Sequence, residues 1–544
     1  MTVDRKSAVS YNGPMLELVF GRGDTLLITV SERSHVSAGS PAGELRASLQ
    51  SVGIGSEVRI DPDLGPFEIH LQATSTGQEA LSAGKKLEGD EFVQATALDG
   101  IRLQSGTRRG LFYAVWNLME QMGWSWPTPQ MTLEPAATSW TFPVGSFVHT
   151  PAIQLRAFYC EQVEITPEMI RWLAHHRYNT LFPSNPSRFA DPEGQFPDES
   201  LALVADLDID LIVGGYCLPW LQEVLGQPPN EDWTSFSPVQ IRKLQEALLQ
   251  VWRDIGNPNV RFSVWPTGPG EKVLAGFLEK ILLQDTSITL ETRLGVPISA
   301  GHCPRVLFSA VDESLPLHSE IDRPLPPPLR GQSLLFLNSG WDSQMAGVLD
   351  PLLCLNQCRR ISHAIEAGYN GITASLCCVP AQSHLERFGF APATVGYMLW
   401  EGSIEASWKR CCALLEAQFE LGAGAIRSLM EEMAGWDFPG KQPEIPHRLH
   451  CHDIIDSEEK RDRLDQAVAE IEESSPTVPL LELARAMATL VNLYDLEELG
   501  DYHESLALAR TIWKQSGIEQ WPAWLQQAAP LVQHLLKEYL QPPR

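Results

Sequence analysis

Carboxylate and indole side chains recur together in this chain where short apolar runs end. Carboxylates transfer protons and bind hydroxyl groups, whereas the face of a Trp or Tyr ring stacks on the apolar face of a pyranose. This combination suits the chemistry of sugars. The candidate substrate-binding residues are Glu161, Tyr216, Trp265, His302, Trp341, Asp342, Trp400 and Glu401.

The adjacent acids Asp312 and Glu313, which follow the apolar run 305–311, are the first candidates for catalysis. Cleavage of a glycosidic bond usually needs one protonated carboxyl group and one ionised carboxylate. We expect Glu313 to be the general acid and Asp312 to be its neighbour in the site. A structural role stays open, because either acid could cap a helix or pair with Arg323. The candidates for the second catalytic carboxylate are Glu161, Asp342 and Glu401.

Eight apolar runs alternate with helix-like segments between residues 151 and 401, which is the pattern of a parallel βα sheet. Eight strands over about 250 residues is the size of a (β/α)8 TIM barrel, whose active site lies at the carboxyl ends of the strands. Ser237 and Gln240 form a capping box that predicts a helix from 238. The expected strands are 153–160, 178–183, 209–216, 260–266, 305–311, 333–338, 371–377 and 395–400.

The predicted fold class is therefore α/β, with a smaller domain on each side of the barrel. Residues 1–150 mix strand and helix patterns and predict an α+β domain. In it, Asp99-Gly100 signals a hairpin, and an amphipathic helix begins after Thr107 and ends at Gly123. The aromatic stretch 124–129 is expected to pack against the next domain. Residues 402–544 show helical patterns throughout and predict an α-helical C-terminal domain.

Charge and composition exclude several classes of partner. With 68 acidic and 41 basic side chains the net charge is −27, which repels nucleic acid. The N-terminus has no signal-like apolar stretch, and no run of about 18 apolar residues predicts a membrane span. We therefore expect a cytoplasmic protein without membrane or nucleic-acid partners. Homo-oligomerisation stays open.

No cofactor or metal is expected. The ten cysteines are too sparse for a disulfide scaffold and include adjacent pairs inside apolar runs, which favours reduced thiols. The histidines and Cys451 of segment 447–452 have no second ligand group at zinc-site spacing. Motifs for nucleotide binding, zinc proteases and serine hydrolases are missing from the sequence.

Segment 91–129 resembles the end of the small domain that precedes the barrel in β-hexosaminidases and α-glucuronidases. In those families a strand, a turn, a second strand, Gly-x-x-[Arg/Asn]-Gly, a helix and an aromatic-Pro exit follow in this order. Gly106, Arg109 and Gly110 occupy the matching positions. The pair Asp312-Glu313 is similar to the Asp-Glu pair of hexosaminidases, in which the Glu is the general acid and the Asp supports a substrate-assisted nucleophile. The expected C-terminal helical domain looks more like the α-glucuronidase arrangement.

Three hypotheses for function remain at this point. The first is a glycoside hydrolase that acts on a short oligosaccharide or glycoside. The second is a sugar lyase or isomerase that uses the same barrel mouth with a His, Tyr or Lys base. The third is a carbohydrate-binding protein without catalytic activity, in which only the stacking aromatic residues would remain.

Overall fold

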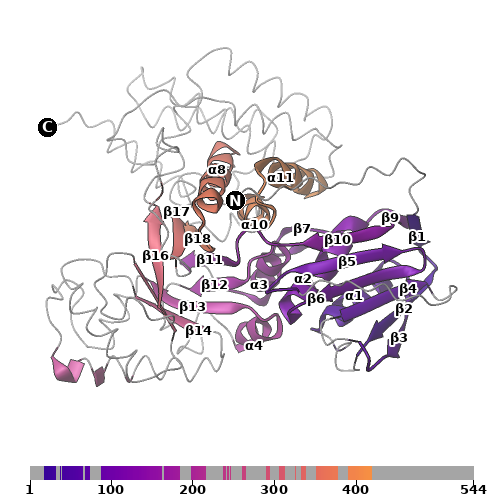
Figure 1. Cartoon of the computed structure of the whole chain (residues 1–544), viewed down its shortest axis with the longest axis horizontal. Helices are drawn as coiled ribbons and strands as arrows, with labels where there is room; N and C mark the ends of the chain where they lie inside the picture. The colour runs from indigo at the N-terminus through magenta and orange to yellow at the C-terminus, as the bar shows by residue number, and fades with distance from the viewer. Residues whose placement is uncertain are drawn as a thin grey trace, which may run out of the picture. The chain divides into compact units, whose positions relative to one another are not determined.

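A computed structural model of the chain provides the fold (Figure 1). The residues that it describes are 17–31, 37, 39–64, 68–73, 87–161, 165–183, 198–215, 260–264, 289–293, 306–312, 333–338, 351–377 and 390–418, with a few isolated positions between 237 and 325.

Contacts divide the chain into two compact units. Unit 1 comprises residues 1–124 and 134–150, and unit 2 comprises residues 125–133 and 151–544. The chain thus leaves unit 1 at Trp124, contributes a short hairpin to unit 2, and returns at Glu134. Among the described helices, none is both long enough and apolar enough to cross a membrane.

Unit 1 contains a six-stranded sheet in the order β10-β5-β6-β4-β2-β3, in which only β2 and β3 run parallel (Figure 1). A separate antiparallel pair is formed by β1 and β9. The strands are β1 Glu17–Gly21, β2 Thr25–Val30, β3 Gly55–Ile60, β4 Glu68–Ala73, β5 Phe92–Ala97, β6 Gly100–Ser105, β9 Ser139–Pro143 and β10 Gly145–His149.

Two helices, α1 (Pro41–Ser51) and α2 (Arg108–Met122), pack on each other and on this sheet. The predicted hairpin is confirmed, because Ala97 pairs with Gly100 across a two-residue turn at Leu98 and Asp99. The predicted helix is confirmed as well. The Thr107 hydroxyl caps its first turn, and Gly123 ends it with a φ of 101°, a left-handed conformation that glycine adopts without strain.

Unit 2 contains a closed ring of eight parallel strands. It closes where β18 pairs with β11, the first strand of the ring. The strands in ring order are β11 Leu155–Glu161, β12 Thr180–Pro183, β13 Asp210–Gly215, β14 Val260–Val264, β15 Thr289–Arg293, β16 Val306–Asp312, β17 Ser333–Asn338 and β18 Gly371–Cys377.

Seven of the eight predicted strands lie in this ring, and the eighth prediction is wrong. Residues 395–400 belong to helix α10 (Phe390–Glu401), in which every residue from 392 to 400 is buried. A helix that is covered on all sides has no polar stripe, so its apolar run cannot be distinguished from a buried strand by periodicity. The missing strand is β15, whose sequence TLETR carries little apolar signal. The strand that ends at Asp312 is therefore the sixth of the ring and not the fifth.

Described helices of unit 2 lead back to strands through a repeated turn. The helices α3 (Pro167–His175), α4 (Asp198–Asp206) and α8 (Pro351–Ala367) end before β12, β13 and β18 respectively. After them, Arg177, Asp208 and Gly368 adopt φ values of 71°, 57° and 87°. In each case the next amide bonds back to a carbonyl of the last helical turn, as in a Schellman motif. The residues that donate these amide groups are buried; they are Tyr178, Ile209 and Tyr369.

Helix α10 packs on α8 and on α11 (Ile404–Gln418) (Figure 1). The hairpin of unit 2 consists of β7 (Ser125–Thr128) and β8 (Met131–Leu133), and β7 contacts α3, α10 and α11. Trp126 is thus buried within unit 2, and Trp124 is buried as well. The predicted capping box is also confirmed, since the Ser237 amide donates to Gln240 and the Gln240 amide donates to the Ser237 hydroxyl.

Candidate functional site

The carboxyl ends of the ring strands define the candidate site, because parallel strands of a barrel end on the same side. Two predicted acids stand at this edge. Glu161 is the last residue of β11 and Asp312 is the last residue of β16. Glu161 is in register with Cys377 at the end of β18, and Asp312 is in register with Leu337.

Six of the other predicted site residues lie outside the described residues, namely Tyr216, Trp265, His302, Glu313, Trp341 and Asp342. Three of them directly follow a described strand in the sequence: Tyr216 after β13, Trp265 after β14 and Glu313 after β16. Their assignment to the barrel mouth stays a prediction.

The two remaining predictions, Trp400 and Glu401, are corrected by the structure. They end helix α10, and the Trp400 carbonyl accepts a hydrogen bond from Ala152, which precedes β11. They therefore lie near the amino end of β11, away from Glu161. Trp400 is buried under the guanidinium groups of Arg156 and Arg177, which lie 5.0 and 5.9 Å from its ring centroid. It is a packing residue.

Below the carboxyl edge, the barrel interior is filled by aromatic and aliphatic side chains. The Tyr159 ring contacts Phe182 and Phe336 edge to face, with centroids 5.0 and 5.4 Å apart. Ile212 and Leu334 complete this cluster, and Tyr159 is fully buried. Because these five residues come from β11, β12, β13 and β17, they show which positions of those strands face inward. Tyr159 precedes Glu161 by two residues, so it forms the floor beneath the edge.

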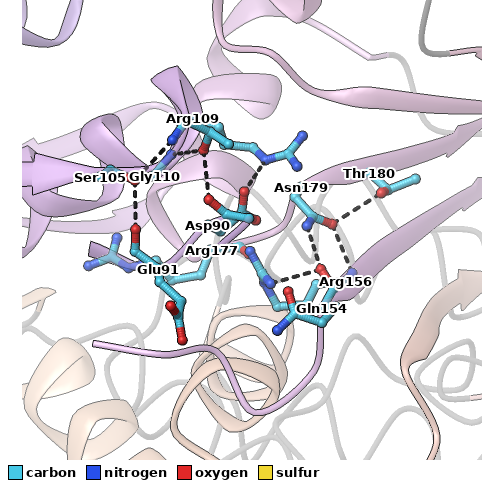
Figure 2. Close-up of polar contacts among 12 residues, drawn as sticks. Asp90, Glu91, Ser105, Arg109, Gly110, Gln154, Arg156, Arg177, Asn179 and Thr180 are labelled. Carbon is cyan, nitrogen blue, oxygen red and sulfur yellow. Dashed lines mark hydrogen bonds and ion pairs between the residues drawn. The ribbon is translucent and has the colours of Figure 1, made fainter. Parts of the chain in front are cut away.

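The amino end of β11 is held by a polar network (Figure 2). The Arg156 guanidinium donates to the carbonyls of Arg177, Ile153 and Gln154. The Asn179 side chain accepts from the Arg156 amide at 2.8 Å and donates to the Gln154 carbonyl at 2.7 Å. These contacts join β11 to the segment before β12 and satisfy buried backbone groups, which is a structural role.

In unit 1, the residues of the Gly-x-x-Arg-Gly segment 106–110 and their neighbours also have a structural role (Figure 2). Arg109 Nε forms an ion pair of 2.8 Å with Asp90 Oδ1, and the Asp90 side chain is only 2% exposed. The Ser105 hydroxyl donates to the Glu91 carbonyl at 2.6 Å. A Cβ at Gly110 would lie 2.0 Å from the Ser105 hydroxyl oxygen, so only glycine allows this approach. The motif fixes the start of α2 against β5 and β6.

The part of the chain that the structure describes contains no group of three or more His, Cys, Asp or Glu residues able to hold a metal ion. The segment 447–452, which contains three histidines and Cys451, lies outside that part.

The sequence matches no protein-family model and no curated protein. The fold is similar to a family 89 glycoside hydrolase from Clostridium perfringens in complex with 2-acetamido-1,2-dideoxynojirmycin, with a TM-score of 0.51 and 10% identity over 78% of this chain and 61% of that chain. A complex of that enzyme with GlcNAc-α-1,4-galactose gives a TM-score of 0.51 and 11% identity over 77% of this chain and 60% of that chain. A family 123 glycoside hydrolase from the same organism gives a TM-score of 0.29 and 11% identity over 67% of this chain and 75% of that chain. This chain thus spans about three fifths of the family 89 structures.

Tyr159, which lies beneath the carboxyl edge, is not among the residues predicted from the sequence. The alternation of side chains along a strand could have indicated it, because Ala157, Tyr159 and Glu161 are alternate residues of β11.

Proposed function

We propose that the chain is a glycoside hydrolase that cleaves a glycosidic bond by acid/base catalysis between two carboxyl groups, with Glu313 as the general acid. The observation that carries this proposal is that Glu161 and Asp312 each end a strand of one closed parallel barrel. In barrels of this kind, catalytic residues come from the carboxyl ends of several strands.

Strand parity supports Glu313 over Asp312 as the acid. Val311 is in register with Phe336, a residue of the barrel interior, and Glu313 is two positions after Val311. Glu161 is likewise two positions after Tyr159, another interior residue. Since residues of equal parity share a face of a strand, this spacing favours Glu313 and Glu161 as the pair of acids, with Asp312 as the neighbour of Glu313 in the sequence.

Ring geometry supports Glu161 as the second carboxylate. Between β16 and β11 stand only β17 and β18, so the two strands are three places apart in a ring of eight. With strands spaced by about 4.8 Å and tilted by roughly 36°, their ends are on the order of 14 Å apart across the mouth. A span of this size across the mouth is compatible with two carboxyl groups that act on one glycosidic bond from opposite sides.

The similarity in fold to the family 89 glycoside hydrolase agrees with this class of activity. We further propose a helix after each barrel strand, as in a TIM barrel, and a substrate that carries an N-acetylhexosamine or a glucuronic acid. The resemblance of segment 91–129 to the domain before the barrel in hexosaminidases and α-glucuronidases supports these two sugars.

The test is to assay the full chain on a panel of nitrophenyl glycosides that includes N-acetylhexosaminides and glucuronides in both anomeric forms. We expect turnover of one class, and Glu161→Gln should abolish most of it. Glu401→Gln is the matched control, since Glu401 pairs with Arg410 at 3.0 Å near the other end of the barrel and should be dispensable. Sugar binding without turnover of any glycoside would refute the proposal.

A further inference from the structure

The hairpin of β7 and β8 is anchored to helix α3 through one carbonyl oxygen. The Trp126 carbonyl accepts hydrogen bonds from Trp172 Nε1 at 2.8 Å and from His176 Nε2 at 2.9 Å. The Trp126 ring stacks on His175, with ring centroids 4.0 Å apart. We call the Trp126 carbonyl, Trp172 and His176 the hairpin anchor.

The anchor fixes the protonation state of His176. Because a carbonyl only accepts, Nε2 must carry the proton, and the neutral ring then has its lone pair on Nδ1. His176 is completely buried, and within the described part of the chain Nδ1 has no hydrogen-bond partner. A second proton would therefore place an N–H group and a positive charge where no acceptor receives them. Burial lowers the pKa of His176 from 6.5 to about 3, although the bond to Trp126 opposes the shift.

The neighbours of His176 add to this cost. His175 and Arg177 from its own segment and Arg410 from α11 all disfavour a further positive charge there. Arg410 lies over the ring of Tyr397, which meets His176 edge to face at 5.2 Å, and its charge is paired with Glu401. Helix α10 also approaches closely, since a Cβ at Gly396 would lie 2.2 Å from the His176 carbonyl oxygen. These contacts leave little room for relaxation around the ring.

We propose that His176 is an acid-sensitive anchor, and that mildly acidic pH releases the hairpin 125–133 from helices α3, α10 and α11. Protonation is favourable only after the imidazole reaches water, so acid stabilises the open state of the hairpin over the closed one. This inference goes beyond the proposed function and does not depend on it.

The test is hydrogen exchange of the peptide 125–133 in the full chain, compared between the wild type and His176→Gln. Gln retains an N–H group at the position of Nε2 but does not titrate. The ratio of the two exchange rates cancels the intrinsic pH dependence. Relative to its value at pH 7.5, the ratio should rise by about tenfold at pH 5.5 and by about a hundredfold at pH 4.5, because opening exposes a group with an ordinary pKa of 6.5. His363→Gln on α8 is the control and should behave as the wild type.

A ratio that stays constant with pH would overturn the proposal. So would equal acceleration in peptide 351–367 of α8, which would show that acid opens the whole unit. A wild-type measurement covers the case in which the Gln variant does not fold. Exchange of the imidazole C2 hydrogen should show His176 neutral at pH 5 while the hairpin is closed, and a protonated His176 in a protected hairpin would refute the inference.

Discussion

Replacing Gly396 by alanine sets two effects of opposite sign against each other. In a helix interior, Gly→Ala normally stabilises by roughly 0.5 to 1 kcal/mol, because glycine loses more backbone entropy on folding. Here the new Cβ would lie 2.2 Å from the His176 carbonyl oxygen and 3.0 Å from a ring carbon of Tyr178. The carbonyl belongs to the backbone and cannot rotate away as a side chain can.

Relief of this contact requires α10 to move by about 1 Å relative to the end of α3, in a region where residues 392–400 are all buried. Overpacking of a core typically costs about 1 to 3 kcal/mol, which exceeds the gain in propensity. We therefore expect Gly396→Ala to destabilise unit 2 by about 1 to 2 kcal/mol, and Gly396→Ser to cost more.

The assay is urea unfolding followed by far-ultraviolet circular dichroism, with exchange of α10 amides as a local readout of unit 2. The local readout is needed because a chain of two units need not unfold in one step. A Gly396→Ala variant as stable as the wild type, or more stable, would refute the close approach of α10 to α3.

Three further predictions concern single side chains. Since the pKa of His176 is lowered to about 3, the unfolded chain binds the extra proton first as pH falls below 6.5. Unit 2 should therefore lose up to about 1.4 kcal/mol of stability per pH unit between pH 6 and 4, and urea titrations should show a smaller slope for His176→Gln. Arg109→Ala leaves the buried Asp90 carboxylate without its ion pair and should destabilise unit 1 by about 3 kcal/mol, with Arg109→Lys intermediate, as measured by thermal unfolding. Asp208→Gly should raise the stability of unit 2 by up to about 1 kcal/mol, because glycine adopts the φ of 57° at this turn without strain, and an unchanged melting temperature would contradict this.

The sequence predicted seven barrel strands because each is a short apolar run with a turn signal beside it. It did not predict β15, in which Thr289, Glu291, Thr292 and Arg293 leave Leu290 as the only apolar residue. A strand of this composition has no hydrophobic pattern to detect. At 395–400 the sequence predicts a strand where the structure has helix α10. This helix is apolar on every side, so hydrophobicity alone does not reveal its helical period.

The candidate site could be predicted only in part, for a related reason. Glu161 and Asp312 were placed at strand ends because their strands were recognised. The apolar run 395–400 predicts a strand and therefore also predicts Trp400 and Glu401 at the barrel mouth. In the structure these two residues end helix α10, and the Trp400 carbonyl accepts a hydrogen bond from the amide of Ala152. The sequence does not predict the buried Arg156 either, because the Arg177 carbonyl that accepts from its guanidinium is 21 residues away and is brought close only by the fold.

The most direct test of the central claim is the rate of glycoside hydrolysis by Glu313→Gln on substrates with good and poor leaving groups. Gln keeps the shape of the side chain but cannot donate the proton that a poor leaving group needs, so hydrolysis of an alkyl glycoside should fall on the order of 10²–10⁴-fold. A dinitrophenyl glycoside needs little protonation and should retain most of its rate. Wild-type rates on both substrates, with an unchanged circular dichroism spectrum, would contradict the assignment of Glu313 as the general acid.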